Sequence, residues 1–149
     1  MPLEEDIKQE KFENEFEKVA VNILFTGSWL YSTNANRLKK YDVTPEQYNV
    51  LRILRGSHPN AIMLADITSR MIDKSSNATR LVEKLRLKNL VKRELCENNR
   101  RQVDISITDK GLNLLKKVDA SSAEWTATLK NISKTEAIEL NRVLDKLRG

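Results

Sequence analysis

The apolar residues of this chain follow two different spacings, and the change from one to the other limits the fold more than any other feature. Before residue 88 and again after residue 111, apolar side chains recur every three or four positions, which is typical of helices with one buried face. Residues 103–107 instead alternate between apolar and polar side chains, as a half-buried strand does. The sequence therefore predicts a mainly α-helical fold with one small β element.

The composition indicates one helical domain without a membrane segment. The 149 residues suit a single folding unit, residues 1–149, and they include only 4 Gly and 3 Pro. The first ten residues are acidic where a secretory signal is basic, and polar side chains interrupt the most apolar stretch, residues 19–30. Cys96 is the single cysteine, which excludes an internal disulfide and fits a reducing compartment. We therefore expect a cytoplasmic protein.

Helical spacing and a capping signal predict the first two helices. Apolar residues recur at helical spacing over residues 5–39, which predicts one long helix. Thr44 is followed by Pro45 and then by Gln47, which is the pattern of a capping box with proline in the first turn. A second helix should begin there and end near Gly56.

The next segment predicts a short helix and then a helix with one polar face. Leu64, Ile67 and Met71 are spaced for a short third helix. Asp73 is a plausible cap for a fourth helix over residues 74–88. The face of this fourth helix that we expect to be buried consists of Ala78, Leu81, Val82 and Leu85.

A hairpin and further helices are predicted for the rest of the chain. Residues 91–95 can pair with residues 103–107 across a polar tip. Thr108 leads back into a helix that we expect to continue to about residue 130. Ser133, with glutamate three positions later, makes another capping box and opens the last helix.

Positive charge is concentrated in one part of the chain. The net charge is +5, but residues 70–101 hold ten basic and four acidic side chains, so this segment alone carries +6 and the remainder −1. The first twenty residues hold seven acidic and three basic side chains. A basic segment in an otherwise neutral or acidic protein is the pattern expected of a surface that binds a phosphate backbone, although a run of charges is often only a solvated face.

The order helix, helix, short helix, helix, hairpin is that of a winged helix-turn-helix. In such a fold the fourth helix enters the DNA major groove, and its first residues reach base edges and phosphates. Asn77 can pair with adenine and Arg80 with guanine or a phosphate, while an arginine at the hairpin tip fits a narrow minor groove. A plain helix start is the other interpretation of residues 75–77. The candidate DNA-binding residues are Lys74, Ser75, Ser76, Asn77, Thr79, Arg80, Lys84, Arg100 and Arg101.

Two segments resemble the MarR (multiple antibiotic resistance regulator) family of winged helix-turn-helix transcriptional regulators. DKSSNATRLVEKLRLKNLVKR is similar to the recognition helix of that family, and NNRRQVDISITDKG to its wing. The resemblance implies a DNA-binding part at about residues 42–110, with dimerisation helices at about 5–39 and 110–148. One departure concerns the wing, where the family commonly has an aspartate two positions before the arginine and this chain has Asn99.

The same resemblance implies a homodimer that binds a pseudo-palindromic double-stranded operator, acts as a repressor, and is released by a small aromatic or anionic effector. Such effectors lie between the dimerisation helices and the winged domain. Trp29, Tyr31 and Trp125 are the candidate effector-binding residues, and packing in the core or a dimer interface is the alternative role for these aromatic side chains.

Nothing in the sequence indicates catalysis. It has no glycine-rich phosphate loop, no HExxH motif, no spacing of cysteines and histidines for a metal, and a single histidine, His58. We therefore expect neither an enzyme, nor a cofactor, nor a metal site. The alternative function is a winged helix that binds an acidic protein partner, although such a surface should carry more exposed apolar side chains than this one does.

Overall fold

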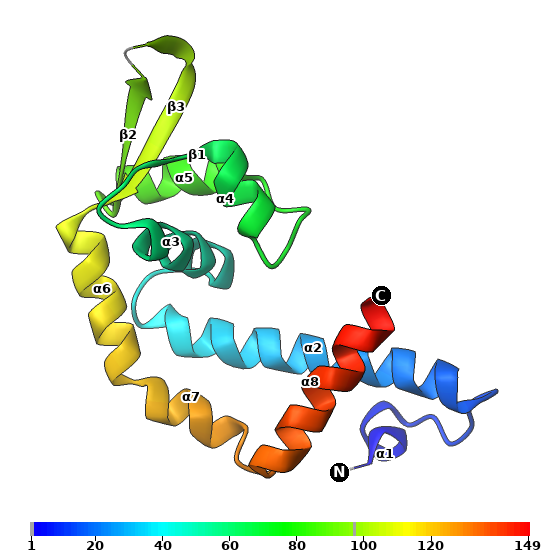
Figure 1. The fold of residues 1–149 in the computed structure, drawn as a ribbon. Helices are drawn as coiled ribbons and strands as arrows, with labels where there is room; N and C mark the ends of the chain where they lie inside the picture. Colours follow the sequence, from blue (N-terminus) through cyan, green and yellow to red (C-terminus); the bar gives the residue numbers. More distant parts are fainter. Residues whose placement is uncertain (1, 97) are drawn as a thin grey trace.

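The computed structural model describes residues 2–96 and 98–149, with only the backbone described at residues 100 and 101. The helices are α1 (Leu3–Ile7), α2 (Glu15–Lys39), α3 (Pro45–Ser57), α4 (Leu64–Arg70), α5 (Ala78–Leu87), α6 (Asp109–Ala120), α7 (Ser122–Thr128) and α8 (Lys134–Arg148). The strands are β1 (Ile62–Met63), β2 (Val91–Cys96) and β3 (Asn99–Ile107). Figure 1 shows the β2–β3 hairpin at the opposite end of the molecule from α1, α2 and α8. Among the helices described, none is long and apolar enough to cross a membrane.

The predicted long helix over residues 5–39 is wrong at its N-terminal end, where the chain forms two helices. Asn14 begins α2, because its side-chain oxygen accepts hydrogen bonds from the backbone N–H groups of Phe16 and Glu17. The short α1 folds back onto α2, with Leu3 buried and an ion pair between Glu4 and Lys18. Hydrogen bonding by a capping asparagine thus overrides an apolar spacing that continues across the break.

The winged-helix part of the molecule contains both the predicted capping box and the core. The capping box predicted at Thr44 is confirmed: its hydroxyl accepts from the Gln47 N–H, and the Gln47 side chain accepts from the Thr44 N–H. From α3 to α6 the helices and the sheet enclose a contiguous cluster of apolar side chains. Its fully buried members include Leu38, Val50, Leu51, Leu54, Ile67, Met71, Leu85, Ile105, Leu115 and Val118.

The hairpin is confirmed, and it belongs to a three-stranded antiparallel sheet in the order β1-β3-β2. Val91 pairs with Ile107 and Leu95 with Val103, as the alternation of apolar residues requires. A bulge between Leu95 and Cys96 shifts the register toward the tip. The sequence analysis missed β1, because two residues are too few to show an alternation.

The fourth predicted helix begins later than expected. Asp73 does not cap it; Asn77 does, and its Oδ1 accepts from the Arg80 N–H at 3.0 Å. Asp73 instead closes a turn of its own by accepting from the N–H and the hydroxyl of Ser75. Residues 74–76 therefore lie in this turn, and α5 starts at Ala78. Its buried side chains are Ala78, Val82 and Leu85, with Leu81 half-buried.

The helix predicted from Thr108 to about residue 130 is divided in two. Thr108 caps α6 through the Gly111 N–H, and the helix ends at Ser121, where α7 takes a new direction (Figure 1). Gly111 packs so closely that a Cβ there would lie 2.4 Å from the Leu90 carbonyl oxygen. The capping box at Ser133 is confirmed as the start of α8.

Candidate DNA-binding surface

The turn before α5 is held rigid by short polar contacts. Asp73 Oδ1 accepts from the Ser75 N–H at 2.9 Å and from the Ser75 hydroxyl at 2.6 Å. These bonds, the hydroxyl bond first, hold the pKa of Asp73 below its ordinary value. The ammonium of Lys74 donates to the Ser69 carbonyl oxygen at the end of α4. The turn therefore presents a defined surface at the N-terminal end of α5.

The first residues of α5 present polar and basic side chains to solvent. Asn77, Thr79 and Arg80 are exposed, while Ala78 is buried between them and fixes the rotation of the helix. The Oδ1 atom of Asn77 is occupied by capping, so a contact with a base falls to its amide NH2 group unless the cap opens. Ser75 is exposed and Ser76 half-buried.

The basic side chains of this region divide into those with a carboxylate partner and those without. Arg86 forms two hydrogen bonds with Glu83, which lower the pKa of Glu83, and Lys88 pairs with Asp42. Arg80 and Lys84 have no carboxylate within ion-pair distance among the residues described. Arg80 in the first turn of α5 and Lys84 in its last turn are therefore available to a phosphate or a guanine.

The hairpin lies beside α5, and the backbone of Arg100 and Arg101 forms part of β3. The side chains of these two arginines lie outside the described residues. Asn99, which stands where the resembled family commonly has aspartate, is paired with Cys96 in the strand register, next to the bulge.

The three aromatic effector candidates do not share one site. The Tyr31 hydroxyl donates to Glu46 Oε1 at 2.8 Å, and Tyr31 lines a cavity of about 310 Å³. The cavity is lined by Tyr31, Ala35, Lys39, Asp42, Val43, Thr44, Pro45, Gln47 and Lys88, and neither Trp29 nor Trp125 is among them. Trp125 is half-buried against Arg37, and Trp29 is 45% exposed on α2.

Sequence reasoning missed two polar contacts, one that joins α2 to the winged helix and one within the winged helix. Arg37 lies between two rings, with its Cζ 5.6 Å from the centre of Tyr48 and 5.3 Å from that of Trp125. Asn49 Oδ1 accepts from the Ile72 N–H at 2.9 Å, which ties the turn before α5 to α3. Both are contacts between segments far apart in the chain, and no local pattern announces them.

Three comparisons agree with this geometry. Residues 43–103 match the model of the MarR family. MgrA, an HTH-type transcriptional regulator of Staphylococcus aureus, is 28% identical over 109 residues, which are 73% of this chain and 72% of MgrA. MdtR, an HTH-type transcriptional repressor of Bacillus subtilis, is 36% identical over 74 residues, 50% of this chain and 46% of MdtR. The crystal structure of a MarR transcription factor from Planctomyces limnophilus is 26% identical, with a TM-score of 0.71, and covers 91% of this chain and 98% of that one.

An exposed polar and basic helix end beside a two-stranded wing defines a DNA-binding winged helix-turn-helix protein. In sequence and in fold the chain is similar to the MarR family of transcriptional regulators, whose family model matches residues 43–103. The relatives and fold neighbours found are transcription regulators rather than enzymes, which confirms the expectation that this chain is no enzyme.

Proposed function

We propose that this regulator binds a specific double-stranded operator as a homodimer, represses transcription there, and is released by a small anionic effector. The observation that carries the proposal is the exposed polar side of α5, where Arg80 in the first turn and Lys84 in the last turn have no carboxylate partner among the described residues. We assign DNA binding to residues 42–110 and dimerisation to residues 5–39 and 110–148. The repressor role is supported by the similarity to MdtR, which is itself named a repressor.

In this proposal α5 enters the major groove with its N-terminal end leading. Arg80 contacts a guanine or a phosphate, Thr79 and the Asn77 amide NH2 reach base edges, and Lys84 contacts the backbone. We assign the arginine side chains of residues 100 and 101, whose backbone forms part of β3, to the minor groove. The remaining contacts, to phosphates, fall to Lys74, Ser75 and Ser76.

The test is binding to a duplex that the protein itself selects from a random-sequence pool, compared with a scrambled duplex. Arg80→Ala should weaken binding to the selected duplex by about 1 to 3 kcal/mol, because one base contact is lost. Arg52→Ala is the matched control, since it removes the same charge from an exposed side chain of α3 that stacks on Tyr48. Equal losses in the two variants would contradict the assignment of Arg80 to a base contact. Equal, weak binding of the wild-type protein to both duplexes would favour the alternative function, binding of an acidic protein partner.

The dimer is supported by the apolar side chains that α2 and α8 leave exposed. Helix α8 has no buried residue, and Leu140, Val143 and Leu147 form an apolar row along it. On α2, Phe16 is 86% and Leu24 74% exposed. Burial of such a surface against a second copy would remove it from water, at about 25 cal/mol per Å² of apolar area.

Sedimentation equilibrium tests the dimer directly. Val143→Glu should shift the protein toward monomer, because a buried carboxylate without a partner is costly. Asn141→Glu, at an exposed position of the same helix outside this apolar row, adds the same single negative charge and is the control. A wild-type protein that sediments as a monomer at micromolar concentration would contradict the proposal.

The effector is assigned to the cavity that Tyr31 lines, between α2, the start of α3 and Lys88. Its volume of about 310 Å³ suits a small molecule. Lys39 and Lys88 give it two cationic groups against the single carboxylate of Asp42, and the Tyr31 ring offers a stacking surface. BpsR of Bordetella bronchiseptica, which has the same fold with a TM-score of 0.77 at 19% identity, is regulated in its DNA binding by the small aromatic acid 6-hydroxynicotinic acid.

A panel of aromatic carboxylates, scored by release of the selected duplex, tests this assignment. Lys39→Gln should weaken the response to an active compound without removing DNA binding, because Lys39 lies on α2 away from α5. Lys18→Gln, on the same helix but outside this cavity, is the matched control. An active compound with equal potency on wild type and Lys39→Gln would place the effector elsewhere.

A further inference from the structure

A side-chain amide of α3 holds the start of the turn before α5. The Ile72 N–H donates to Asn49 Oδ1 at 2.9 Å. Met71 before it is buried in the core, whereas the Ile72 side chain is 87% exposed. After Met71, the Asn49 amide therefore holds the backbone at the entry to the turn that leads to Asn77 and α5.

Asn49 shares one face of α3 with Glu46, which lies one helical turn earlier. Glu46 accepts the hydrogen bond of the Tyr31 hydroxyl from α2 at 2.8 Å. This bond raises the pKa of Tyr31, and partial burial and the charges of Glu46 and Asp73 raise it further. Tyr31 is thus within electrostatic reach of the turn, which in Figure 1 extends from the end of α4 toward α2. One face of α3 therefore contacts α2 on one side and the turn on the other.

We propose that Tyr31, Glu46 and Asn49 form a connection through which the position of α2 sets the position of the turn before α5. The inference rests on the proposed function, because the turn matters only if α5 reads DNA. A shift of α2 moves Tyr31 and with it Glu46, and the rigid α3 carries the displacement one turn along to Asn49. Asn49 then moves the Ile72 backbone and the leading end of α5. In this arrangement Asn49 is a positioning residue for DNA recognition, although it lies outside the candidate DNA-binding residues.

The connection also links the effector cavity to the DNA-binding surface. Tyr31 is a wall of that cavity, and its hydroxyl is the atom bonded to Glu46. A molecule that binds there and displaces the ring breaks the Tyr31–Glu46 bond. The free energy of this bond then limits how far the effector can change DNA affinity through this route.

A double-mutant cycle on DNA binding tests the connection. Tyr31→Phe and Asn49→Ala should each weaken binding to the selected duplex by about three- to tenfold, the effect of one lost hydrogen bond, with affinity for scrambled duplex within about twofold of wild type. The double variant should bind like the weaker single variant, because breaking one link already interrupts the series. Asn49→Asp keeps the oxygen acceptor and should recover most of the preference for the selected duplex. The preference is the ratio of the affinities for the selected and the scrambled duplex, and the added negative charge lowers both affinities alike.

Tyr41→Phe is the matched control, since it removes a tyrosine hydroxyl that bonds α6 and Ser121 rather than α3. Its effect should multiply with that of Asn49→Ala. Multiplication of the Tyr31→Phe and Asn49→Ala effects, or an equal loss on both duplexes, would overturn the connection while leaving the proposed function intact. A wild-type protein without preference between the duplexes would overturn the proposed function and this inference together.

Discussion

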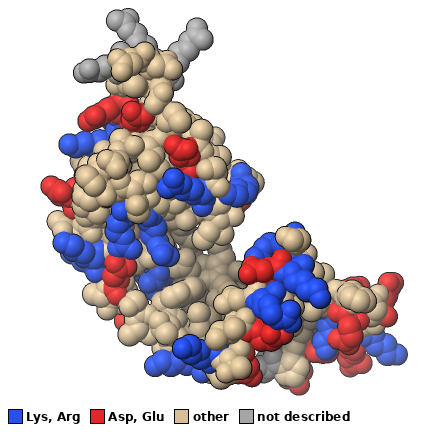
Figure 2. Space-filling model, in the orientation of Figure 1, with Lys and Arg blue, Asp and Glu red and all other residues tan. Residues whose placement is uncertain are grey.

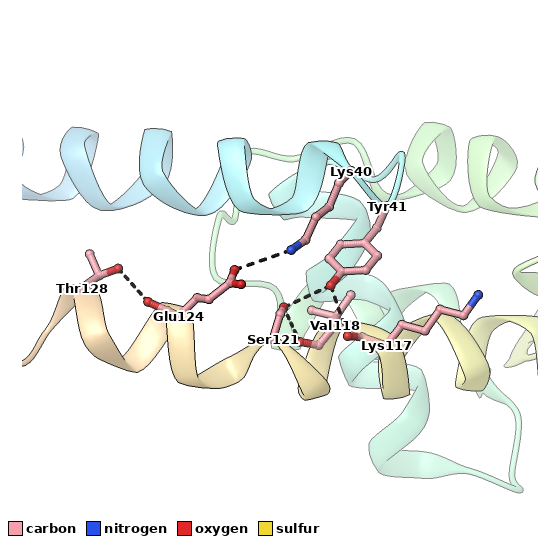
Figure 3. A network of polar contacts seen from close by, with 7 residues as sticks. All are labelled: Lys40, Tyr41, Lys117, Val118, Ser121, Glu124 and Thr128. Atoms are coloured by element: carbon pink, nitrogen blue, oxygen red, sulfur yellow. Dashed lines mark hydrogen bonds and ion pairs between the residues drawn. The ribbon is translucent and has the colours of Figure 1, made fainter.

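Tyr41, just after α2, donates its hydroxyl hydrogen bond to Ser121, the residue at which α6 gives way to α7 (Figure 3). The distance is 3.1 Å, and the Lys117 carbonyl oxygen lies 3.2 Å from the same hydroxyl. Lys40 forms an ion pair with Glu124 beside it. Because Ser121 also bonds the Val118 carbonyl oxygen, the bend between the two helices is tied to the end of α2. This junction fixes the direction in which α7 leaves α6.

Removal of the Tyr41 hydroxyl should loosen this junction. Tyr41→Phe is expected to lower the free energy of unfolding by about 1 kcal/mol, the usual contribution of one hydrogen bond, as measured by urea denaturation. Tyr48→Phe is the control, since the described residues offer its hydroxyl no hydrogen-bond partner. A loss as large in Tyr48→Phe would mean that ring packing, not the hydroxyl, carries the effect.

Asn77 should matter for the stability of α5 as well as for DNA. Asn77→Ala removes the cap on the Arg80 N–H and is expected to cost about 1 kcal/mol in urea unfolding. Asn77→Asp keeps a capping oxygen and should unfold like wild type, while its new negative charge weakens DNA binding. If Asn77→Asp is as unstable as Asn77→Ala, capping is not the role of this side chain.

Gly111 and Gly56 should respond in opposite directions to alanine. A Cβ at Gly111 would lie 2.4 Å from the Leu90 oxygen and 2.7 Å from Ile107 Cγ1, so Gly111→Ala should destabilise the protein by about 1 to 3 kcal/mol. A Cβ at Gly56, within α3, meets nothing within 4 Å among the described atoms, and Gly56→Ala should stabilise by about 0.5 to 1 kcal/mol. Thermal unfolding of both variants checks the two signs, and a stable Gly111→Ala protein would contradict the close packing of α6 on the sheet.

The stability of the turn that precedes α5 should depend on the ionisation of Asp73, and therefore on pH, only at acidic pH. The hydrogen bonds with Ser75 lower the pKa of Asp73 from its ordinary value of 3.8. The ionised carboxylate therefore contributes its full stabilisation of the turn when the pH is above 3.8, and this stabilisation is lost as the pH falls through the lowered pKa. A carbon-13 NMR titration should give a midpoint below 3.8, and Ser75→Ala should raise it. An identical midpoint in the two proteins would show that the Ser75 hydroxyl does not bind Asp73.

The elements that the sequence predicted correctly are those whose signal is local. The capping boxes at Thr44 and Ser133 and the alternation over residues 103–107 each specify their own structure within a few residues. The errors at Asn14 and Asn77 both concern where a helix begins, because in both places a capping asparagine starts the helix later than predicted. At Asn14 the apolar spacing continues across the cap, and at Asn77 the expected cap was Asp73. Helical periodicity reports which face is buried, not where the backbone hydrogen bonds begin.

The sequence proposes the candidate site as a set of residues, and only the fold shows how the described ones are arranged. The sequence located the basic segment, yet only the fold pairs Arg86 and Lys88 with carboxylates and leaves Arg80 and Lys84 available among the described residues. Outside the site, acidic side chains gather over α1 and the start of α2 in Figure 2, as the composition of the first twenty residues suggested. The Asn49–Ile72 bond depends on tertiary contact, so no sequence pattern could reveal it.

The measurement that tests the central claim most directly is the affinity of the wild-type protein for its selected duplex and for a scrambled one, between about 50 and 200 mM salt. We predict at least about a thousandfold preference for the selected duplex, with both affinities falling steeply as salt rises, because specific contacts by α5 add to phosphate contacts by its basic side chains. Equal and weak binding to both duplexes would contradict the claim that this winged helix reads DNA sequence.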